Sequence, residues 1–412
     1  MKFLHSSDWH LGIKLYGRTR YEEQEAFLSW LIDTVNTHEI ELLLVSGDIF
    51  DSSMPANKAQ ELYYGFLGRL AKTTCKHAVI IAGNHDSSSL LGAPAELFKM
   101  MDIHVVGQIG EQPEDSLIYL RDKAGKLQAI VCAVPYLRER ELRQVDAGES
   151  LSDKEEKLQQ GIKSRYQDVI EAAYNEKEYS PEIPIVVMGH LYMQESYLNE
   201  SNAVRELYLG SIIRSSVDIF AERLSYVALG HLHRCQKVGG KDQIRYSGSP
   251  IPLSFAEAEY PHKVLIGHLR EASGVQDLEV PQSYIMKSIA GDEEQIVAVM
   301  KELIEQDQIC LIEVEYRGTG SGSLLRDEVN ELLKGSRVEL LRFQNRQYVE
   351  TTLRMNEDYA DLATLDPKQV FEKRLEKMAS DEPEFDEAEI KTLWACYHQI
   401  LQELQESYSN AE

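Results

Sequence analysis

The chain has 412 residues, 43% hydrophobic and 27% charged, a composition typical of a globular protein with two or three domains rather than a disordered, collagen-like or membrane-spanning one. Five widely spaced cysteines with no Cys-x-x-Cys pair argue against a disulfide framework and a thiolate zinc site. The net charge of -25 opposes simple binding to a polyanion. Part of this charge is local, because the segment from Glu350 onward has 16 acidic and 6 basic residues.

The first 270 residues alternate short apolar runs with amphipathic stretches, a pattern typical of α/β layers. Residues 21–37 carry apolar side chains at helical spacing, which predicts a helix that crosses over between two strands. Residues 142–178 are highly charged with a helical apolar stripe, and we expect an exposed, inserted helix outside the core. The predicted strands are nearly continuous apolar runs at residues 2–6, 42–46, 78–82, 128–134, 183–188 and 226–229.

Beyond residue 280 the pattern changes to that of a smaller unit. Its periodicity predicts strand, helix, strand, helix and strand at residues 284–290, 292–306, 309–317, 323–334 and 338–344. Two further helices are expected after Pro367, and the second has a narrow, nearly heptad stripe. The fold class that we predict is α/β, with a large layered domain, a small α/β domain and C-terminal helices.

Five segments end an apolar strand in a turn and place metal-ligand side chains directly after it. They are residues 3–10, 42–48, 79–86, 186–190 and 226–233, with the candidate ligands Asp8, His10, Asp48, Asn84, His190, His231 and His233. Taken singly, the first, second and fourth segments have ordinary explanations, because Asp and Gly dominate turns and a lone histidine is more often structural. Residues 83–86 and 230–233 are harder to explain in this way, since several ligand-type side chains follow one buried strand. Their repetition favours a site, since the carboxyl edges of neighbouring strands converge on one crevice.

The candidate ligands comprise three carboxylate or amide oxygens and four imidazoles, a mixed set that suits Mn²⁺, Fe²⁺ or Zn²⁺. Seven ligands are too many for one ion. Two ions about 3.5 to 4 Å apart that share one carboxylate accommodate the number, and this arrangement serves in-line displacement at phosphorus. We therefore predict a centre of two divalent metal ions that hydrolyses phosphoesters.

The order Asp-x-His, Gly-Asp, Gly-Asn-His-Asp, Gly-His and Gly-His-x-His resembles that of the calcineurin-like metallophosphoesterases. Within this family, the stretches at 7–12, 47–51, 83–86 and 246–252 are most similar to DNA nuclease subunits that act with an SMC-type ATPase. The resemblance is firm up to about residue 270 and looser beyond it. It implies a β-sandwich metallophosphoesterase (nuclease) domain at 1–275, a capping domain that contacts DNA at 280–350, and C-terminal helices at 365–412 that dock on the coiled coil of the ATPase.

The resemblance also implies a role for each candidate residue. One ion would be held by Asp8, His10, Asp48 and His233, and the other by Asp48, Asn84, His190 and His231, so that Asp48 bridges the two. His85 matches the histidine that contacts the scissile phosphate and protonates the leaving oxygen, for which an uncoordinated imidazole is suited. Asp86 would orient His85 or a ligand. Archaeal relatives carry histidine where Asp51 stands, so the resemblance assigns Asp51 no role.

The implied activity is that of an ATP-dependent double-strand DNA nuclease, a 3′–5′ exonuclease and endonuclease that processes ends and hairpins in repair and recombination. Mn²⁺ is the expected metal. The sequence has no Gly-x-x-x-x-Gly-Lys-Ser/Thr loop, so ATP would come with the ATPase, in a complex that contains a homodimer of this chain. Two alternatives stay open: a phosphatase or cyclic-nucleotide phosphodiesterase with the same ligands, and a non-catalytic scaffold.

The sequence also bears on cellular location. It contains no run of about 18 apolar residues, and its first ten residues turn polar too early for a signal peptide. We therefore expect a cytoplasmic protein without a membrane partner. The five cysteines are then expected to be small core residues rather than disulfide partners.

Overall fold

The structure is a computed structural model that describes residues 1–142, 150–196, 214–220, 223–270 and 274–346, together with Trp394 and Tyr397. Met1–Gln344 form one compact unit and Asn345–Glu412 a second. In the second unit, Trp394 and Tyr397 are helical and their rings meet edge to face, with centroids 5.7 Å apart. The other positions of the predicted C-terminal helices at 365–412 lie outside the described residues.

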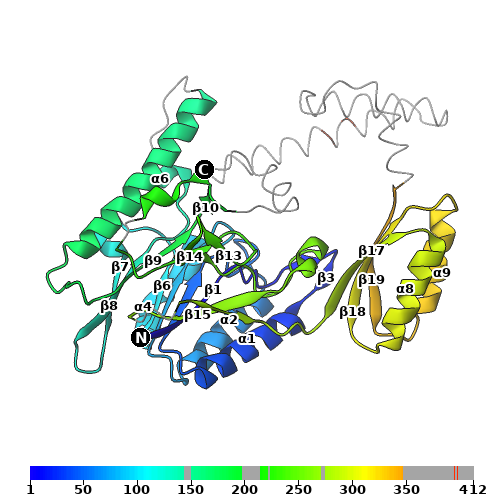
Figure 1. Ribbon diagram of the computed structural model, residues 1–412, viewed down its shortest axis with the longest axis horizontal. Helices are drawn as coiled ribbons and strands as arrows, with labels where there is room; N and C mark the ends of the chain where they lie inside the picture. The colour runs from blue at the N-terminus through cyan, green and yellow to red at the C-terminus, as the bar shows by residue number, and fades with distance from the viewer. Residues whose placement is uncertain are drawn as a thin grey trace. The chain divides into compact units, whose positions relative to one another are not determined.

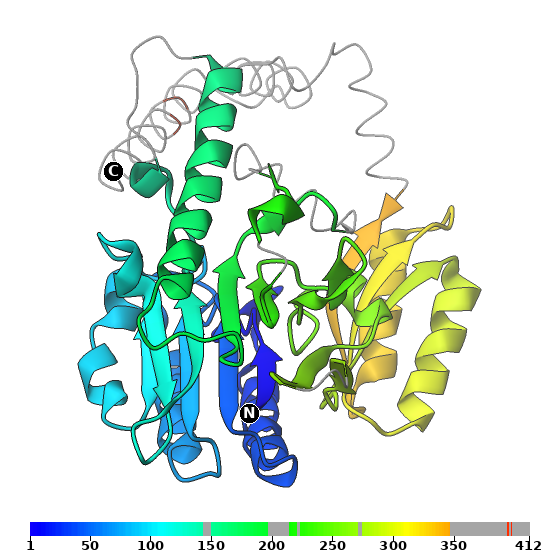
Figure 2. The ribbon, with the colours of Figure 1, turned by 60° about the vertical axis from the view of Figure 1, so that its left-hand side comes forward.

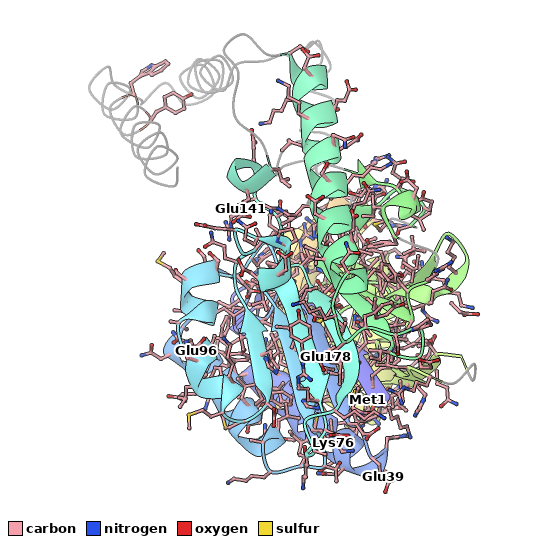
Figure 3. The ribbon with its side chains drawn as sticks, turned by 90° about the vertical axis from the view of Figure 1, so that its left-hand side faces the viewer. Met1, Glu39, Lys76, Glu96, Glu141 and Glu178 are labelled. Carbon is pink, nitrogen blue, oxygen red and sulfur yellow. The ribbon has the colours of Figure 1, made fainter. Side chains whose placement is uncertain are left out.

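Two six-stranded sheets form the core of the first unit (Figure 1). The first sheet has the order β16-β15-β1-β4-β5-β6, in which β1, β4, β5 and β6 run parallel and β15 and β16 pair antiparallel. Parallel strands put their carboxyl ends at one edge, and Met1, Glu39 and Lys76 lie near the opposite edge (Figure 3). The strands are β1 (Lys2–Ser6), β4 (Leu42–Ser46), β5 (His77–Ile81), β6 (Ile103–Val106), β15 (Lys263–His268) and β16 (Gln276–Glu279).

The second sheet has the order β13-β14-β12-β9-β8-β7. Its inner strands β14, β12, β9 and β8 run parallel, and β13 and β7 pair antiparallel at the edges. The strands are β7 (Leu117–Arg121), β8 (Leu127–Ala133), β9 (Ile185–His190), β12 (Tyr226–Gly230), β13 (Gln236–Val238) and β14 (Lys241–Tyr246). The six strands predicted from the sequence are confirmed, and each begins and ends within two residues of its expected position.

The two sheets pack face to face, and their inner faces share one apolar core (Figure 2). Side chains of alternate residues meet there, among them Phe3, Leu42, Leu44, Val79 and Ile81 from the first sheet and Ala129, Val131, Val186, Met188 and Ala228 from the second. The intervening residues of each strand point to the outer faces. Because helices cover these outer faces too, the strands appear in the sequence as nearly continuous apolar runs.

Three helices provide this outer cover. The apolar stripes of α1 (Tyr21–Thr37) and α2 (Asn57–Leu70) pack on the first sheet. One half of α6 (Leu151–Tyr174) packs on the second sheet, and the other half of the helix extends past the strand ends (Figure 2). The helix expected at 142–178 is therefore present, but its placement outside the core is wrong, because its stripe faces the sheet. The buried side chains of this stripe are Leu158, Ile162, Tyr166, Val169, Ile170 and Ala173.

Shorter elements connect the strands of the two sheets. Those before β7 are the hairpin of β2 (Lys14–Leu15) and β3 (Arg18–Thr19), then α3 (Ser88–Gly92), α4 (Ala95–Lys99) and the 3-10 helix η1 (Pro113–Ser116). Those after it are α5 (Glu139–Leu142), the paired β10 (Tyr192–Met193) and β11 (Arg214–Ser215), η2 (Val217–Ile219) and η3 (Phe255–Glu259).

The small α/β domain begins at β17. Its elements are β17 (Ile285–Gly291), α8 (Glu293–Glu305), β18 (Cys310–Tyr316), α9 (Gly322–Leu333) and β19 (Val338–Asn345), with sheet order β17-β18-β19. Met300 and Val329 of the helices share a core with Ile312 of β18. All five elements were predicted in this order, each to within two residues. Because Met1–Gln344 form one compact unit, the domain limits 1–275 and 280–350 stay predictions.

The β2–β3 hairpin joins the large domain to the small one. Arg18 Nε donates to Glu339 Oε2 at 2.7 Å, and the Arg18 guanidinium lies 4.9 Å from the centroid of the Tyr284 ring. Arg342 Nη1 donates to the Tyr16 hydroxyl at 2.8 Å. An apolar cluster of Leu15, Phe255, Tyr284, Met286 and Leu311 accompanies these contacts. The loop that follows β1 therefore continues directly into contacts with the small domain.

The described residues also bear on the expectations about membranes and cysteines. Among them, no helix combines the length and apolar character needed to cross a bilayer. The described cysteines, Cys75, Cys132, Cys235 and Cys310, are free thiols. Cys132 and Cys310 are buried as small core residues, and the other two are half-buried.

Candidate metal centre

The predicted ligands come together at the end of β9, which carries His190, and in the loops that follow β1, β4, β5 and β12. Two hydrogen bonds cross between the sheets beside them. Ser46 Oγ donates to the Ala228 carbonyl at 3.0 Å, and His190 Nδ1 donates to the Ser46 carbonyl at 2.9 Å. The centre is therefore assembled from the carboxyl ends of strands in both sheets, which is where an α/β fold concentrates its ligand chemistry.

Four predicted ligands have a left-handed backbone: Asp8, His10, Asp48 and His231, with φ of 54°, 44°, 49° and 104°. They are half of the eight non-glycine residues with positive φ in the described chain. Such conformations are uncommon and persist where the surrounding structure enforces them. Here Asp8 N donates to Gly47 O and His10 N to Asp48 O, both at 3.0 Å, so two neighbouring loops hold each other in place.

Glycines at the strand ends leave room for these side chains. A Cβ on Gly47 or Gly230 would collide with the ring of His190, and one on Gly83 would collide with the carboxylate of Asp48. Of these three glycines, Gly47 alone also has a positive φ, 87°. These three glycines are therefore required mainly by the close approach of neighbouring groups, not by turn geometry alone.

Asp8, His10 and His233 form the first half of the centre, with ligand atoms within 4.8 Å of one another. The rings of His10 and His233 are edge to face, with centroids 5.1 Å apart. His10 Nε2 is buried, finds no hydrogen-bond partner among the described residues and lies 3.5 Å from Asp48 Oδ2. A buried imidazole nitrogen that lies near carboxylates and makes no hydrogen bond is in an environment typical of a metal ligand.

Asp48 and His190 form the second half, and their ligand atoms also lie within 4.8 Å of that of Asp8. His190 Nε2 lies 3.3 Å from Asp48 Oδ2 and 2.9 Å from Asn84 Oδ1. His231 Nδ1 lies 3.2 Å from the same Asn84 oxygen. The Asp48 carboxylate therefore faces both halves, which agrees with the bridging position that the resemblance implies.

His85 lies beside the first half. Its backbone N–H donates to Asp48 Oδ1 at 2.9 Å, and its ring packs edge to face against His10 with centroids 4.8 Å apart. Ring Nδ1 lies 2.9 Å from the Asp51 carbonyl. A carbonyl only accepts, so Nδ1 carries a proton and Nε2 is the nitrogen that can act on a phosphate. The predicted role of His85 in proton transfer is compatible with this orientation.

Asp86 is fully buried and holds backbone rather than an imidazole ring. Its carboxylate accepts hydrogen bonds from the amides of Gly83, Ile49 and Phe50 at 2.8, 3.1 and 2.9 Å. Burial, and then the charge of Asp48, raise the pKa of Asp86 to about 6. Asp86 thus ties the loop after β5 to the loop after β4, which carries Asp48.

Buried imidazoles and carboxylates shift one another's pKa values. Burial lowers the pKa of His190, but the Asp48 carboxylate outweighs this effect and raises the pKa to about 9. Burial likewise opposes charge on His233, and Glu257 raises its pKa to about 9. Burial and the neighbouring His190 lower the pKa of His231 to about 3. Without a metal, protons on two of the imidazoles balance the carboxylates, a role that divalent cations would take over.

The donor set fits divalent cations. Carboxylate and amide oxygens with imidazole nitrogens suit Mn²⁺, Fe²⁺ or Zn²⁺, and the unpartnered Nε2 of His10 would gain a partner. Asp8, His10 and His233 would hold one ion, and the group around Asp48 and His190 the other. Two such ions would lower the pKa of a shared water and offset charge on a phosphate.

Two further residues adjoin the candidate ligands, although the sequence pattern assigns them no role. Glu257 Oε1 lies 3.0 Å from His233 Nδ1, and Asp51 Oδ1 lies 3.3 Å from His10 Nδ1. Neither residue directly follows a strand, so a search for ligands at strand ends does not find them. The one signal for Glu257 was an acidic side chain placed directly after the largely apolar run 251–256.

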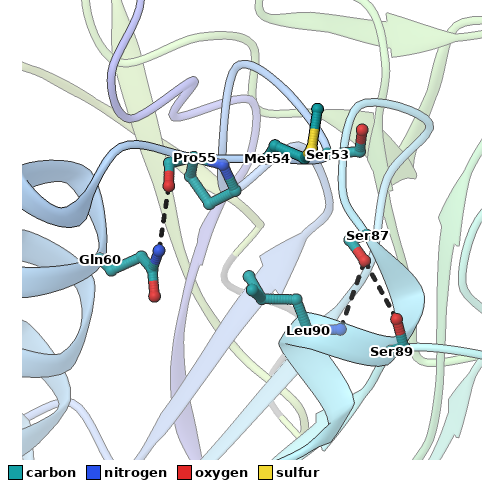
Figure 4. A pocket seen from close by; sticks show the side chains of 7 residues that line it. All are labelled: Ser53, Met54, Pro55, Gln60, Ser87, Ser89 and Leu90. Carbon is teal, nitrogen blue, oxygen red and sulfur yellow. Dashed lines mark hydrogen bonds between the residues drawn. The ribbon is translucent and has the colours of Figure 1, made fainter.

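An open pocket of about 510 Å³ is lined by the loops that follow Asp51 and Asp86 and by the helices α2 and α3 that these loops enter (Figure 4). Its lining residues are Ser53, Met54, Pro55, Gln60, Ser87, Ser89 and Leu90. Gln60 Nε2 donates to the Pro55 carbonyl at 2.9 Å, and Leu90 N donates to Ser87 Oγ at 3.3 Å. The lining segments closely follow Asp51 and Asp86 in the sequence, so the pocket continues the loops after β4 and β5.

Comparison with known families agrees with this geometry. Residues 1–235 match the family model described as calcineurin-like phosphoesterase, and residues 285–379 match one described as type 5 capsule protein repressor C-terminal domain. The first match covers more than half of the chain, so the chain belongs to the calcineurin-like phosphoesterase family. The predicted fold class is thereby confirmed, and so is the prediction of a metal-dependent phosphoesterase.

Similarity to individual proteins extends over nearly the whole chain. The SbcD subunit of the nuclease SbcCD from Escherichia coli (strain K12) is 32% identical over 387 residues, which are 93% of this chain and 94% of that protein. Its namesake in Rhodobacter capsulatus is 32% identical over 68% of this chain and 70% of its own length. That of Bacillus subtilis (strain 168) is 33% identical over 65% and 66%. The resemblance to the nuclease-subunit branch of the family, SbcD, is confirmed.

Proposed function

We propose that this chain is the DNA nuclease subunit of a two-protein complex and cleaves phosphodiester bonds with two divalent metal ions, Mn²⁺ foremost. The observation that carries the proposal is the pair of ligand groups, around Asp8 and around Asp48, at the ends of the strands. Similarity to nuclease subunits over 93% of the chain supports DNA as the substrate. The proposal gives these buried carboxylates and imidazoles a chemical use that folding alone does not require.

Each group in the proposed centre has a separate task. The ions would supply a water of lowered pKa and positive charge beside the phosphorus. The left-handed turns at Asp8, His10 and Asp48 hold the ligand side chains in position. The His85 ring, held by its bond to the Asp51 carbonyl, would contact the scissile phosphate and, as an imidazolium, donate a proton to the leaving oxygen.

The proposed substrates are ends and hairpins of double-stranded DNA, cut by 3′–5′ exonuclease and endonuclease action during repair, recombination and replication in the cytoplasm. Phosphate contacts position a duplex without reading its bases, so cleavage would be independent of sequence. The net charge of -25 requires metals and a partner to supply most of the attraction for DNA. ATP dependence would come from that partner, the SMC-type ATPase SbcC, because the chain has no P-loop sequence.

The proposed complex holds two copies of this chain and two of SbcC, with the helices at 365–412 docked on the coiled coil of SbcC. In the homodimer, α4 would contact the second copy. Leu97 and the adjoining Met100 are 62% and 84% exposed, and a second copy of the chain would cover both side chains. Leu97→Asp should convert a dimer into a monomer in size-exclusion chromatography with light scattering. A wild-type monomer, or an intact Leu97→Asp dimer, would contradict this arrangement.

The alternative activities use the same ligands or none. A phosphatase or cyclic-nucleotide phosphodiesterase would need the same two ligand groups. The small domain favours a nuclease, because a small-molecule esterase has no need of a second domain to hold a duplex. A non-catalytic scaffold leaves the complete ligand set and the oriented ring of His85 without a use.

The experiment that tests the proposal is cleavage of an end-labelled DNA duplex by the purified chain in Mn²⁺, with and without SbcC and ATP. Asp48→Asn removes the shared charge and should lower the rate by at least about 10²-fold. His85→Gln keeps the ligands and should lower the rate while Mn²⁺ binding persists. Hydrolysis of a small phosphodiester, with DNA spared even in the presence of SbcC, would overturn DNA as the substrate.

A further inference from the structure

The imidazoles of the candidate metal centre differ in the group that their Nδ1 atom contacts. His10 and His233, in the half around Asp8, each turn Nδ1 toward a carboxylate, at 3.3 Å from Asp51 Oδ1 and at 3.0 Å from Glu257 Oε1. In the half around Asp48, His190 turns Nδ1 toward a backbone carbonyl instead. In the half around Asp8, two ligand imidazoles therefore contact a carboxylate through Nδ1. In the other half, Nδ1 of His190 contacts an uncharged carbonyl.

Glu257 is built firmly into its position. Its side chain is 3% exposed and, besides His233, accepts from Leu253 N at 2.9 Å and from Ser249 Oγ at 3.4 Å. Burying a carboxylate is costly unless it is paired and hydrogen-bonded, and Glu257 meets both conditions. The η3 helix thus delivers a fixed negative charge to the outer nitrogen of one ligand.

Asp51 has a similar place on the other side of the same half. Its side chain is 30% exposed, its carboxylate faces His10, and its carbonyl accepts from His85. Asp51 N donates to the Leu11 carbonyl at 3.3 Å, which fixes it against the loop that carries His10. This residue, to which the family resemblance gave no role, therefore adjoins two imidazoles of the centre.

Charge distribution extends the asymmetry. Both halves approach the carboxylates of Asp8 and Asp48. The half with His10 and His233 adds the carboxylates of Asp51 and Glu257, whereas the other half adds a neutral amide, Asn84. A carboxylate on the outer nitrogen of a ligand imidazole fixes the ring, directs its free lone pair inward and favours the positive charge of a bound cation. A backbone carbonyl fixes the ring without adding a full charge.

We propose that the half formed by Asp8, His10 and His233 binds its divalent ion first and more tightly, and that Asp51 and Glu257 are the positioning residues that set this order. The inference rests on the proposed two-metal centre and deepens it. The ion in the other half is then the weakly held one, and nuclease activity follows the occupancy of that half as metal concentration rises.

The test is a Mn²⁺ titration of the full chain by calorimetry and electron paramagnetic resonance. Wild type should bind two ions in two separated steps, with an uncoupled Mn²⁺ spectrum at one equivalent and a spin-coupled spectrum at saturation. Glu257→Gln should weaken the tight step by about 10- to 100-fold and change the weak step far less. Asp51→Asn should act in the same direction. High Mn²⁺ should restore DNA cleavage by both variants.

Two controls complete the design. Glu259→Gln removes an exposed charge from the same η3 helix and should leave both steps unchanged. Asn84→Ala should remove the weak step and keep the tight one. If Glu257→Gln does not fold, the half-exposed Asp51→Asn carries the test alone.

Two equal steps, or steps that neither Asp51→Asn nor Glu257→Gln alters, would overturn the inference while wild-type cleavage of DNA keeps the proposed function. A wild type that binds no Mn²⁺ and cuts no DNA would overturn both.

Discussion

The large and small domains are both α/β layers, but they bury different kinds of side chain. Among the described residues, all buried polar and charged side chains lie in the large domain, the last being His262. The large domain also holds seven of the eight positive-φ non-glycine residues, and the small domain holds one, Asp307. Four of those seven residues are candidate ligands, so unusual backbone geometry is concentrated at the candidate centre and is rare in the small domain.

The small domain follows local rules closely. Asp292 opens α8 with a capping box to Gln295, Ser321 caps α9, and one apolar cluster joins both helices to the sheet. Its stability should therefore respond to ordinary core substitutions and be independent of metal. The large domain should respond most strongly where strand ends crowd the centre. Three substitutions and one control variant test this contrast.

The largest effect is expected from Gly230→Ala. A Cβ there would meet the Ser46 carbonyl and the ring of His190, and backbone atoms cannot move aside. We expect a loss of about 3 kcal/mol or more in the free energy of unfolding, together with weakened Mn²⁺ binding. Urea denaturation followed by circular dichroism, and calorimetric metal titration, measure the two effects.

The matched control for Gly230→Ala is Gly65→Ala in α2. A Cβ at Gly65 meets nothing within 4 Å, so alanine should stabilise the helix by about 0.5 to 1 kcal/mol and leave metal binding alone. Equal behaviour of the two variants would show that the strand ends are not crowded in solution.

A smaller effect is expected from Met300→Ala in the small domain. Met300 is fully buried between α8 and the sheet, and its truncation should cost about 3 kcal/mol or somewhat less in the free energy of unfolding. Mn²⁺ affinity should stay at the wild-type value, because no ligand comes from this domain. A variant with lost metal binding would remove the distinction between the two domains.

The smallest effect concerns His5, which is buried in β1 with Nδ1 2.9 Å from the Tyr226 hydroxyl. Burial, and then the charge of Arg245, lower the pKa of His5 to about 3, against about 6.5 in an unfolded chain. Between these values the unfolded state binds a proton that the folded state excludes, so stability falls as pH drops below 6.5. The expected loss at pH 5 is roughly 2 kcal/mol.

His5→Gln should remove this part of the acid sensitivity. Urea denaturation of the metal-free protein at pH 7 and pH 5 provides the measurement, with the variant showing a smaller difference between the two values. An unchanged difference would mean that other buried groups of the large domain account for the acid response.

Much of the architecture was predictable because each layer leaves a simple mark on the sequence. Strands covered on both faces appear as continuous apolar runs, and the elements of the small domain follow regular periods. The candidate ligands could be proposed from the sequence because they lie at or just after strand ends, and the structure brings them together. The placement of α6 was missed, since a charged outer face dominates its composition although its stripe packs on the second sheet.

The pairings inside the centre could not be predicted. His231 and His233 are two residues apart, yet one approaches Asn84 and the other Glu257, which depends on where η3 lies in space. The contact of Asp51 with His10 depends on how the loop after β4 packs against the loop after β1. Both contacts result from tertiary placement, which no local pattern encodes.

The β2–β3 hairpin connects the small domain to the loop that carries His10 of the candidate metal centre. Three residues separate His10 from Lys14, so even a fully extended chain spans only about 14 Å between the two. The Arg18–Glu339 ion pair and the Arg342–Tyr16 hydrogen bond attach the hairpin to the small domain. A rotation of the small domain would therefore either break these two contacts or displace the loop that carries His10. A force applied to the small domain would then act on the backbone of His10, a predicted metal ligand.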